Sequence, residues 1–493
     1  MMRQFRRRCV LVMCLLCSVY AAASAHAESF EIAVSTDESL SGPLAAGRPH
    51  LMTATRKNGT VTVTTYTGVQ TLKGWHTPVG AHPDGAKAPT ICAPNAGTCS
   101  APLGSCVVAS SSSTPIPDLT FANGVAKFCL MAPDVGNFSV SLSDEASPAD
   151  GTSSTLRARP HHFTLSDTSI TQRSDLPACA GSTFGYMGEP FRIAFKLKAW
   201  NQDNVPTKNY AGSFVQFAKP ISGDAAVNTA AWINSADPDS MGLWMVAPGY
   251  VVGSDTCTAK FSGNAPSHET TFVCDGGSNV APVNRTAGPR VVVSMTPEVP
   301  SMVWSNGEGT FSANVMLHRA DKADGAYETL EIGIAPRDAD GVALDVLDMD
   351  ADKNGANERA RVGTTKLRYG RLKIANAHGS ERLPLPINVQ AQYWNGKAYI
   401  TNVNDGCTPL VPGNFIKEDR TGESIETSIA ATGTLSAGTG RIALSKPTQT
   451  PAGKGVVTIK VDDTKLPYLP GAGTATFGIY KSGPVIYRRE LHY

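Results

Sequence analysis

The sequence predicts an all-β fold of tandem antiparallel β-sandwich domains of the immunoglobulin-like kind. Apolar and polar residues alternate with period two in many short runs, and turn-forming pairs separate these runs. The 46 Gly and 33 Pro also disfavour long helices. Short half-buried strands joined by tight turns bury their apolar faces most readily by packing sheet on sheet.

The strands are expected where the alternation is strictest. Residues 191–198 place Phe, Ile, Phe and Leu on one face and Arg, Ala, Lys and Lys on the other, an arrangement that a helix would scatter. The same pattern predicts strands at 60–64, 138–142, 387–393 and 457–461. Pairs that tolerate a positive φ mark turns between the runs: Asn58-Gly59, Asn123-Gly124, Asp150-Gly151, Asp324-Gly325, Asp340-Gly341 and Asn395-Gly396.

The N-terminus has the form of a secretory signal peptide. Four arginines within the first eight residues precede an apolar run from Cys9 to Tyr20, and the small-residue tripeptide Ala25-His26-Ala27 follows. The run is shorter than the roughly 20 residues that a membrane-spanning helix needs. We therefore expect cleavage after residue 27, no transmembrane anchor, and export to the periplasm, the cell surface or the medium. Lipidation at Cys14 or Cys17 is the alternative, although the bulky residues that precede them disfavour it.

Length and charge bound the organisation of the exported chain. Removal of residues 1–27 leaves 39 Lys and Arg against 42 Asp and Glu, a net charge of −3, which gives no electrostatic basis for nucleic-acid binding. The remaining 466 residues exceed what one hydrophobic core usually organises. We expect a Ser-rich linker at 143–155 and three domains, the first with a cysteine-rich loop, at 28–150, 156–286 and 287–493.

Eight cysteines follow the signal peptide, and an even number in an exported chain predicts disulfides. A structural zinc site is the alternative, but the exported part has no C-x-x-C pair and no histidine at ligand spacing near these positions. The pairing stays open, with Cys257 and Cys274 as the simplest local pair. The candidates are Cys92, Cys99, Cys106, Cys129, Cys179, Cys257, Cys274 and Cys407.

An acidic loop is the candidate metal site. Asp348, Asp350, Asp352 and Asn354 alternate oxygen ligands ahead of a turn glycine, as calcium-binding loops do. An EF-hand needs a bidentate Glu at its twelfth position, and Arg361 occupies that position when the count starts at Asp350. A calcium site with fewer ligands and a solvated loop between strands are the two interpretations left. No other cofactor is expected.

Catalytic motifs are missing from the sequence. It has no G-x-S-x-G elbow, H-E-x-x-H helix, P-loop or dinucleotide-binding glycine pattern, so a non-catalytic protein is expected. A glycosidase stays the alternative, because two carboxylates distant in sequence suffice for it. The strings Gln392-Tyr393-Trp394 and Trp75-His76 suit either a carbohydrate platform or core packing. Arg368 and Arg371, followed by Glu381, suggest buried ion pairs at a strand crossing.

Distinctive strings recur from about residue 155 to the end of the chain. Together they resemble the C-terminal region of MshQ-like proteins, a bacterial family associated with the biogenesis of mannose-sensitive haemagglutinin (MSHA) pili, which are type IV pili. The strings are Arg159-Pro160-His161-His162-Phe163, Phe184-Gly185-Tyr186-Met187-Gly188-Glu189-Pro190-Phe191, Thr207-Lys208-Asn209-Tyr210-Ala211-Gly212, Leu367-Arg368-Tyr369-Gly370-Arg371-Leu372, Asn376-Ala377-His378-Gly379-Ser380-Glu381, Asn404-Asp405-Gly406-Cys407-Thr408 and Tyr487-Arg488-Arg489-Glu490.

The resemblance implies a location and a system. It leads us to expect a non-catalytic exported accessory protein of a type IV, MSHA-like pilus, either a minor pilus-associated adhesin or an assembly factor. The expected partners are pilus subunits or pilus-assembly proteins, with host or surface glycans as possible ligands. An extracellular carbohydrate-active enzyme or a lectin unrelated to pili is the alternative.

Overall fold

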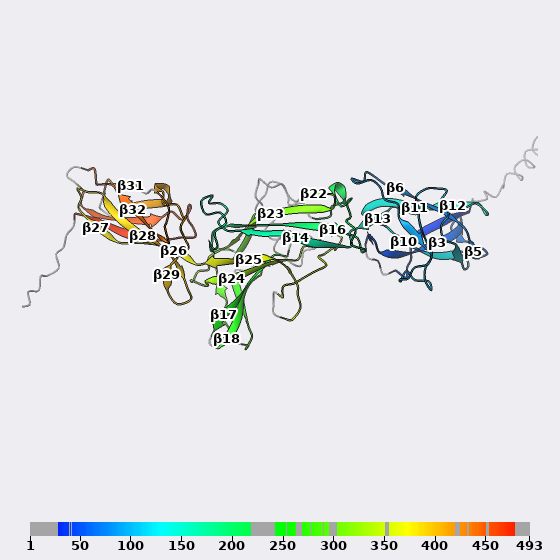
Figure 1. Ribbon diagram of the computed structural model, residues 1–493, viewed down its shortest axis with the longest axis horizontal. Helices are drawn as coiled ribbons and strands as arrows, with labels where there is room; N and C mark the ends of the chain where they lie inside the picture. Colours follow the sequence, from blue (N-terminus) through cyan, green and yellow to red (C-terminus); the bar gives the residue numbers. More distant parts are fainter. Residues whose placement is uncertain are drawn as a thin grey trace, which may run out of the picture. The chain divides into compact units, whose positions relative to one another are not determined.

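The structure is a computed structural model that describes residues 28–478, except 39, 41, 218–241, 253, 263–268, 278, 289, 295–302, 351–353, 420–423, 431–432 and 450–452. Its regular elements are strands and two short 3₁₀ turns, η1 (Gly212–Phe214) and η2 (Pro412–Asn414). The predicted fold class, an all-β chain of tandem antiparallel sandwiches, is confirmed (Figure 1). Among the described residues no helix is long and apolar enough to cross a membrane. The predicted signal peptide lies outside the described residues.

The chain divides into two compact units. The N-terminal unit contains residues 1–162, 199–215 and 304–308, and the C-terminal unit contains the rest. Strands from both sides of the expected boundary at 286/287 share a sheet, so the three-domain division stays a prediction about folding units.

An 11-stranded sheet builds the N-terminal unit, with neighbours in the order β2-β13-β11-β12-β1-β3-β10-β7-β8, β4 on β3 and β6 on β11. Most pairs are antiparallel, while β1 with β12 and β2 with β13 are parallel. A separate pair joins β5 (Gly68–Gln70) and β9 (Leu119–Phe121). The sheet strands are β1 (Glu28–Val34), β2 (Leu44–Ala45), β3 (Pro49–Asn58), β4 (Val61–Thr62), β6 (Lys73–Pro78), β7 (Thr90–Cys92), β8 (Cys106–Val108), β10 (Val125–Met131), β11 (Gly136–Asp144), β12 (Ala149–Thr152) and β13 (Leu156–Arg159).

Several strands of the N-terminal unit contribute to one apolar core. Phe30, Met52 and Phe128 come from β1, β3 and β10, and they share one buried cluster with Phe138 and Val140 of β11. The expected linker at 143–155 is wrong, because this stretch contains the end of β11 and all of β12. Ser143 of β11 pairs with Asp150 of β12, so this part of the segment belongs to the sheet.

Two sheets occupy the first part of the C-terminal unit. A five-stranded sheet has the order β14-β16-β23-β21, with β22 on β23, and a seven-stranded sheet has the order β15-β25-β24-β17-β18-β19-β20. Burial alternates residue by residue along β16, as its sequence predicts. The strands are β14 (His162–Thr171), β15 (Gly185–Tyr186), β16 (Phe191–Trp200), β17 (Trp244–Val252), β18 (Asp255–Ser262), β19 (Glu269–Cys274), β20 (Val283–Asn284), β21 (Val291–Ser294), β22 (Val303–Ser305), β23 (Glu308–Leu317), β24 (Tyr327–Ile334) and β25 (Ala360–Arg368).

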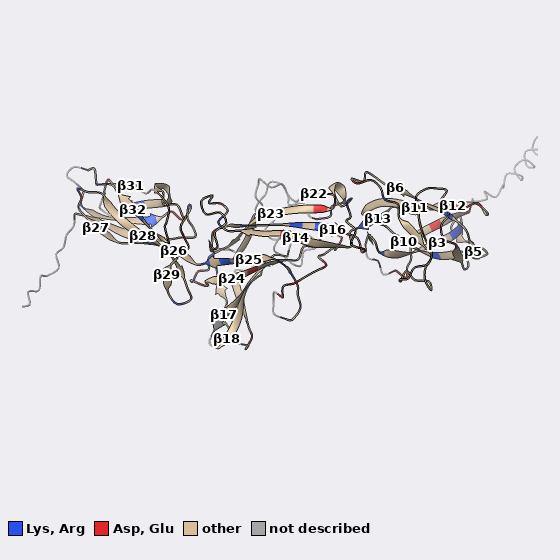
Figure 2. Cartoon of the chain, viewed as in Figure 1, with Lys and Arg blue, Asp and Glu red and all other residues tan. Residues whose placement is uncertain are grey.

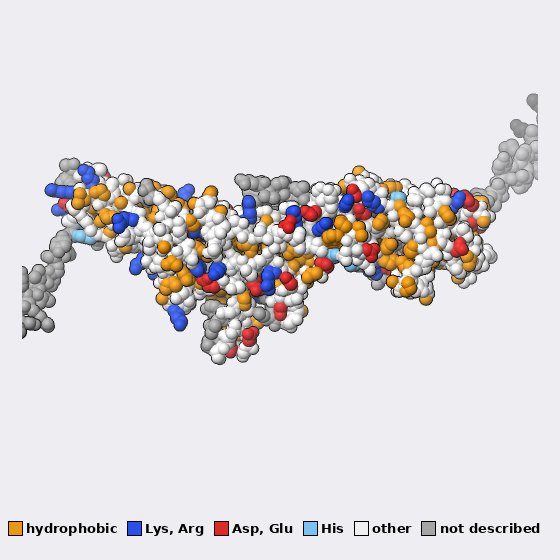
Figure 3. Space-filling view, viewed as in Figure 1, with side chains coloured by type: hydrophobic (Ala, Val, Ile, Leu, Met, Phe, Trp, Pro, Cys, Tyr) orange, Lys and Arg blue, Asp and Glu red, His pale blue; other side chains and the backbone are white. Residues whose placement is uncertain are grey.

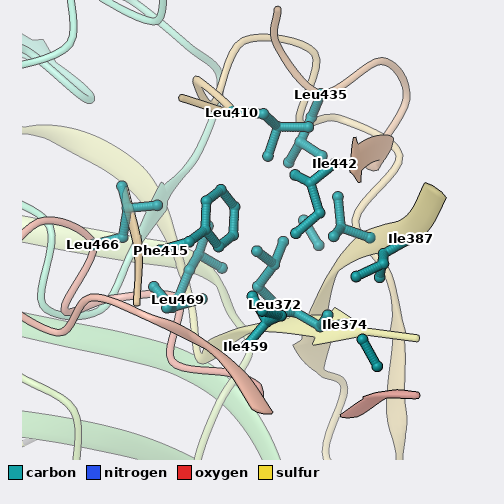
Figure 4. Close-up of a cluster of buried hydrophobic side chains, with 14 of the residues drawn as sticks. Leu372, Ile374, Ile387, Leu410, Phe415, Leu435, Ile442, Ile459, Leu466 and Leu469 are labelled. Carbon is teal, nitrogen blue, oxygen red and sulfur yellow. The ribbon is translucent and has the colours of Figure 1, made fainter. Parts of the chain in front are cut away.

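The C-terminal unit ends in a sandwich that we call the C-terminal sandwich, residues 370–477. One sheet has the order β26-β28-β32-β31, with β29 on β28, and the other has the order β27-β34-β33-β30. Leucine, isoleucine and phenylalanine side chains from both sheets fill the space between them (Figure 4). The strands are β26 (Gly370–Ile374), β27 (Ala377–Gly379), β28 (Leu385–Trp394), β29 (Tyr399–Thr401), β30 (Phe415–Asp419), β31 (Ile429–Ala430), β32 (Thr439–Leu444), β33 (Gly455–Val461) and β34 (Ala472–Phe477).

Truncation of Ile459 tests this core. Its side chain on β33 is fully buried, so Ile459→Ala should lower the free energy of unfolding by about 2–5 kcal/mol through lost burial and a cavity. Ile416→Ala on the neighbouring β30 is the matched control, because that side chain is 43% exposed, and it should lose less than about 1 kcal/mol. Urea denaturation followed by fluorescence measures both, and equal losses would contradict the assigned core.

Candidate functional site

The most elaborate polar site joins the C-terminal sandwich to the sheets that precede it. Residues 172–190, which we call the docking segment, leave β14 and return to β16. Within this segment, β15 pairs in parallel with the end of β25. Phe184 and Tyr186 nevertheless belong to the buried core of the C-terminal sandwich. The docking segment is therefore part of both structures at once.

Arg173 lies at the centre of this joint. Its side chain is fully buried, and its Nε donates to Glu189 Oε1 at 2.9 Å. Nη1 donates to Asp405 Oδ1 at 3.2 Å and Nη2 to Thr408 Oγ1 at 2.6 Å. The backbone of Arg173 has φ of 54°, a left-handed conformation that residues with a side chain adopt rarely. The guanidinium contacts therefore stabilise a left-handed backbone conformation that is unfavourable for an arginine.

Asp405 is the acceptor on the side of the C-terminal sandwich. Tyr186 Oη donates to its Oδ2 at 2.8 Å, and Thr408 Oγ1 donates to the same oxygen at 2.6 Å. Burial alone would raise the pKa of Asp405, but Arg173 and the bonds from Thr408 and Tyr186 lower it below its ordinary value. Burial, together with the nearby negative charge of Asp405, raises the pKa of Glu189 above its ordinary value, and the contacts with Arg173 offset this rise only in part. The site thus holds one cation between two acidic groups.

A disulfide links the two sides of the same joint. Cys179 in the docking segment is bonded to Cys407, two residues after Asp405, with a sequence separation of 228. Arg173 Nη1 also lies 3.2 Å from Cys407 Sγ. The covalent link and the charge network therefore coincide in space.

A second set of contacts supports the joint from β25. Arg368, almost fully buried, donates to Glu328 Oε1 at 3.1 Å and to Asn402 Oδ1 at 2.5 Å. The expected pairing of Arg368 with Glu381 is wrong, because Glu381 lies 4.0 Å from Lys454 instead. The local sequence could not reveal Glu328, which belongs to the neighbouring strand β24.

An arrangement of arginine, aspartate and tyrosine occurs at three buried places in the described residues. In each, the guanidinium donates to a carboxylate oxygen within 3.2 Å, and a tyrosine hydroxyl donates to the same carboxylate at 2.7 or 2.8 Å. The sets are Arg56, Asp144 and Tyr66 in the N-terminal unit, and Arg173, Asp405 and Tyr186 together with Arg290, Asp324 and Tyr327 in the C-terminal unit. The members of the joint's set lie furthest apart in sequence.

The other predicted disulfides are present too. Cys92 bonds with Cys106 and Cys99 with Cys129 in the N-terminal unit. Cys257 bonds with Cys274 across β18 and β19, as their short spacing suggested. All eight cysteines among the described residues are thus paired.

A groove of about 960 Å³ lies beside the cysteine-rich loop of the N-terminal unit. Charged side chains line it, but they pair with one another: Arg48 with Glu38 at 3.1 Å and Lys127 with Asp37 at 2.6 Å. These pairs offset most of the charge in the groove, so it has no strong preference for anions or cations.

The acidic loop at 348–358 turns several of its oxygens onto its own backbone. Asp350 accepts the N–H groups of Asn354 at 3.2 Å and Gly355 at 2.9 Å, and Asp348 accepts that of Arg361 at 2.7 Å. Asp352 lies outside the described residues. The described residues contain no group of three or more His, Cys, Asp or Glu side chains placed to hold a metal ion. Calcium binding stays a prediction.

The fold and this joint define a disulfide-bonded chain of tandem β-sandwiches. Residues 134–241 match the third domain of DUF6701, and residues 368–491 match the fourth domain of DUF6701. Arg173, Cys179 and Glu189 lie in the first match and Asp405 and Cys407 in the second. The joint therefore connects the two regions of the chain that match DUF6701 domains.

Comparison with solved structures gives distant likenesses. The Escherichia coli adhesin FdeC is 11% identical, with 92% of this chain and 97% of that chain covered and a TM-score of 0.32. Invasin, a bacterial integrin-binding protein, is 9% identical over 91% of this chain and 60% of its own, with a TM-score of 0.21. InvD of Yersinia pseudotuberculosis is 10% identical over 88% and 92%, with a TM-score of 0.22. No curated protein matches the chain.

Removal of the long-range disulfide tests the joint. The double variant Cys179→Ser/Cys407→Ser should lower the free energy of unfolding by about 2–5 kcal/mol, because the closed loop is long. Cys257→Ser/Cys274→Ser is the matched control, with a separation of 17, and should lose less. Thermal melts of both variants under non-reducing conditions measure the difference, and a larger loss in the control would contradict the expectation.

Removal of the charge on Asp405 tests the network. Asp405→Asn leaves Arg173 buried with a single carboxylate, so we expect a loss of about 3–5 kcal/mol in the free energy of unfolding. Glu418→Gln, which removes an exposed partner of Lys460, should change it by less than about 1 kcal/mol. Guanidinium titration compares them, and a loss at Asp405 no larger than the loss at Glu418 would refute the importance of the network.

Proposed function

We propose that this chain is an exported, non-catalytic protein that works by binding or assembly as an accessory protein of a type IV, MSHA-like pilus system. The observation that carries the proposal is that residues of the distinctive sequence strings lie buried at the joint. Tyr186, Glu189, Arg368 and Asp405 belong to the strings that resemble MshQ-like proteins, and all of them are buried at the joint. The strings thus serve to hold sandwiches together, a role that suits a structural or adhesive protein.

Two further features support export and an extracellular role. Four disulfides involve all eight cysteines after the signal peptide, and disulfides persist in oxidising compartments such as the periplasm and the cell surface. The matches to DUF6701 cover both sides of the joint. Within the pilus system the chain acts either as a minor pilus-associated adhesin or as an assembly factor, with pilus subunits or assembly proteins as partners.

Capture from native cells tests the proposal. A tagged chain is isolated after mild crosslinking, and the proteins attached to it are identified by mass spectrometry against an untagged control. We expect pilins or pilus-assembly proteins to be enriched. A second sample with Cys179→Ser/Cys407→Ser shows whether partner binding needs the disulfide at the joint. This variant should capture less of the pilus proteins.

The opposite outcome is equally specific. A chain that is free in the medium and captures no pilus protein would overturn the pilus role. It would then favour the carbohydrate-active enzyme or lectin that the sequence left as the alternative.

A further inference from the structure

One sheet of the C-terminal sandwich carries positive charge without any acidic residue. The strands β26, β28, β29, β31 and β32 contain no Asp or Glu, whereas Arg371, Lys373 and Arg441 lie on the side opposite the core. Figure 2 colours the Lys and Arg residues of the chain blue and the Asp and Glu residues red. We call the outward side chains of β26, β28 and β32 the cationic face.

The strand register places each cation in a row with an amide or small polar side chain. Arg371 lies opposite Gln392 and Lys373 opposite Gln390 across β26 and β28. Arg441 lies opposite Asn388 across β28 and β32. Successive rows are separated by two residues, about 7 Å along the strands. The face therefore presents three parallel rows of hydrogen-bonding groups.

Neutral partners hold Arg371 in position. Arg371 donates through Nε and Nη2 to Gln392 Oε1 at 2.9 and 2.8 Å, and Gln392 Nε2 donates to Gln390 Oε1 at 2.8 Å. The Arg371 guanidinium also stacks 3.7 Å from the ring centre of Tyr399. Within the described part of the chain, Arg371, Lys373 and Arg441 form no ion pair. The charge of Arg371 is thus fixed in direction, and no acidic side chain among the described residues neutralises any of the three cations.

The other sheet of the same sandwich shows the contrast. There Lys460 pairs with Glu418 at 2.7 Å and Lys417 with Asp419 at 2.8 Å. On the face in Figure 3, blue side chains predominate over red ones on the C-terminal sandwich. Since the exported chain has a net charge of −3, the positive charge is a local property of this face.

The face is also hollowed. A depression of about 590 Å³ lies between Lys373 and Arg441, and the small residues Ala375 and Gly440 are part of its lining. Its polar lining comes from Lys373, Asn388, Gln390, Thr439 and Arg441. At the other end of the rows, Trp394 and Tyr399 form a half-buried aromatic pair with ring centres 5.4 Å apart.

We propose that the cationic face binds an anionic polysaccharide that bears carboxylate or sulfate groups. The cations match the acidic groups through charge-assisted hydrogen bonds, and the amides match hydroxyl groups. The aromatic pair offers a ring surface with a polar edge, which suits a sugar. Charge complementarity along an open strip of three rows fits a polymer better than a compact small molecule. The inference rests on the proposed binding role, but it does not depend on the pilus partner.

Binding of polygalacturonate and heparin to the complete exported chain tests the proposal. We expect at least one of them to bind at low salt, more weakly at 0.5 M salt, while neutral dextran does not bind. Lys373→Gln/Arg441→Gln should weaken binding by at least about tenfold, because two charge-assisted contacts are lost. Lys460→Gln on the opposite sheet is the matched control and should bind like the unaltered chain. Biolayer interferometry gives the dissociation constants, and thermal melts verify that the variants stay folded.

Three results would overturn the proposal. They are binding to neither polysaccharide, unchanged binding by Lys373→Gln/Arg441→Gln, and equally tight binding of a single-stranded oligonucleotide of similar charge. None of them affects capture of pilus proteins from cells, so failure of this inference is distinguishable from failure of the pilus role.

Discussion

The burial of a guanidinium between two carboxylates is the constraint on which the C-terminal unit depends. Arg173 cannot leave water unless its donors find acceptors, because an unpaired buried charge destabilises a fold by several kcal/mol. Its acceptors are Glu189, Asp405 and Thr408, and the rings of Phe184 and Tyr186 lie 5.4 and 5.3 Å from the guanidinium carbon. These groups come from the docking segment and from the C-terminal sandwich. The docking segment and the C-terminal sandwich therefore depend on each other for their ordered conformations.

The chain path reinforces this constraint. β25 ends at Arg368 and β26 begins at Gly370, so a single residue, Tyr369, separates a strand of one sheet from a strand of the next. Tyr369 Oη donates to the carbonyl of Ala320 at 3.1 Å, and Arg319 lies 3.9 Å from its ring centre. Domains joined by long linkers usually move relative to each other. Here the connection is short, buried and bonded on both sides, so the C-terminal sandwich is held firmly against its neighbour.

The repeated use of arginine, aspartate and tyrosine indicates how this chain tolerates buried charge. The tyrosine hydroxyl occupies a lone pair of the carboxylate that the guanidinium leaves free, so fewer polar atoms stay unsatisfied. In the N-terminal unit, Asp144 accepts hydrogen bonds from both Arg56 and Tyr66. Such networks impose specific geometry on cores that apolar residues alone would fill in several ways.

Local patterns in the sequence predicted the local features well. The alternation at 191–198 predicts β16, and the short spacing of Cys257 and Cys274 predicts their bond. Partners far apart in sequence could not be predicted, because nothing in the pattern around Arg173 points to Asp405, 232 residues away. The Ser-rich stretch at 143–155 misled for a physical reason. Its polar residues resemble a loop in composition, yet backbone pairing between β11 and β12 organises residues 143–144 and 149–152 as strands. The strings around Tyr186 and Asp405 marked the joint without revealing that they meet.

The bond between Cys179 and Cys407 has a consequence for how the chain responds to proteolysis. A protease that cuts the backbone anywhere between these residues opens the chain but does not divide it, since the fragments stay covalently connected. The segment protected in this way includes the seven-stranded sheet and the loops that connect its strands. A nicked molecule would therefore keep both flanking parts attached and could go on bearing load, which an uncrosslinked chain of sandwiches could not do.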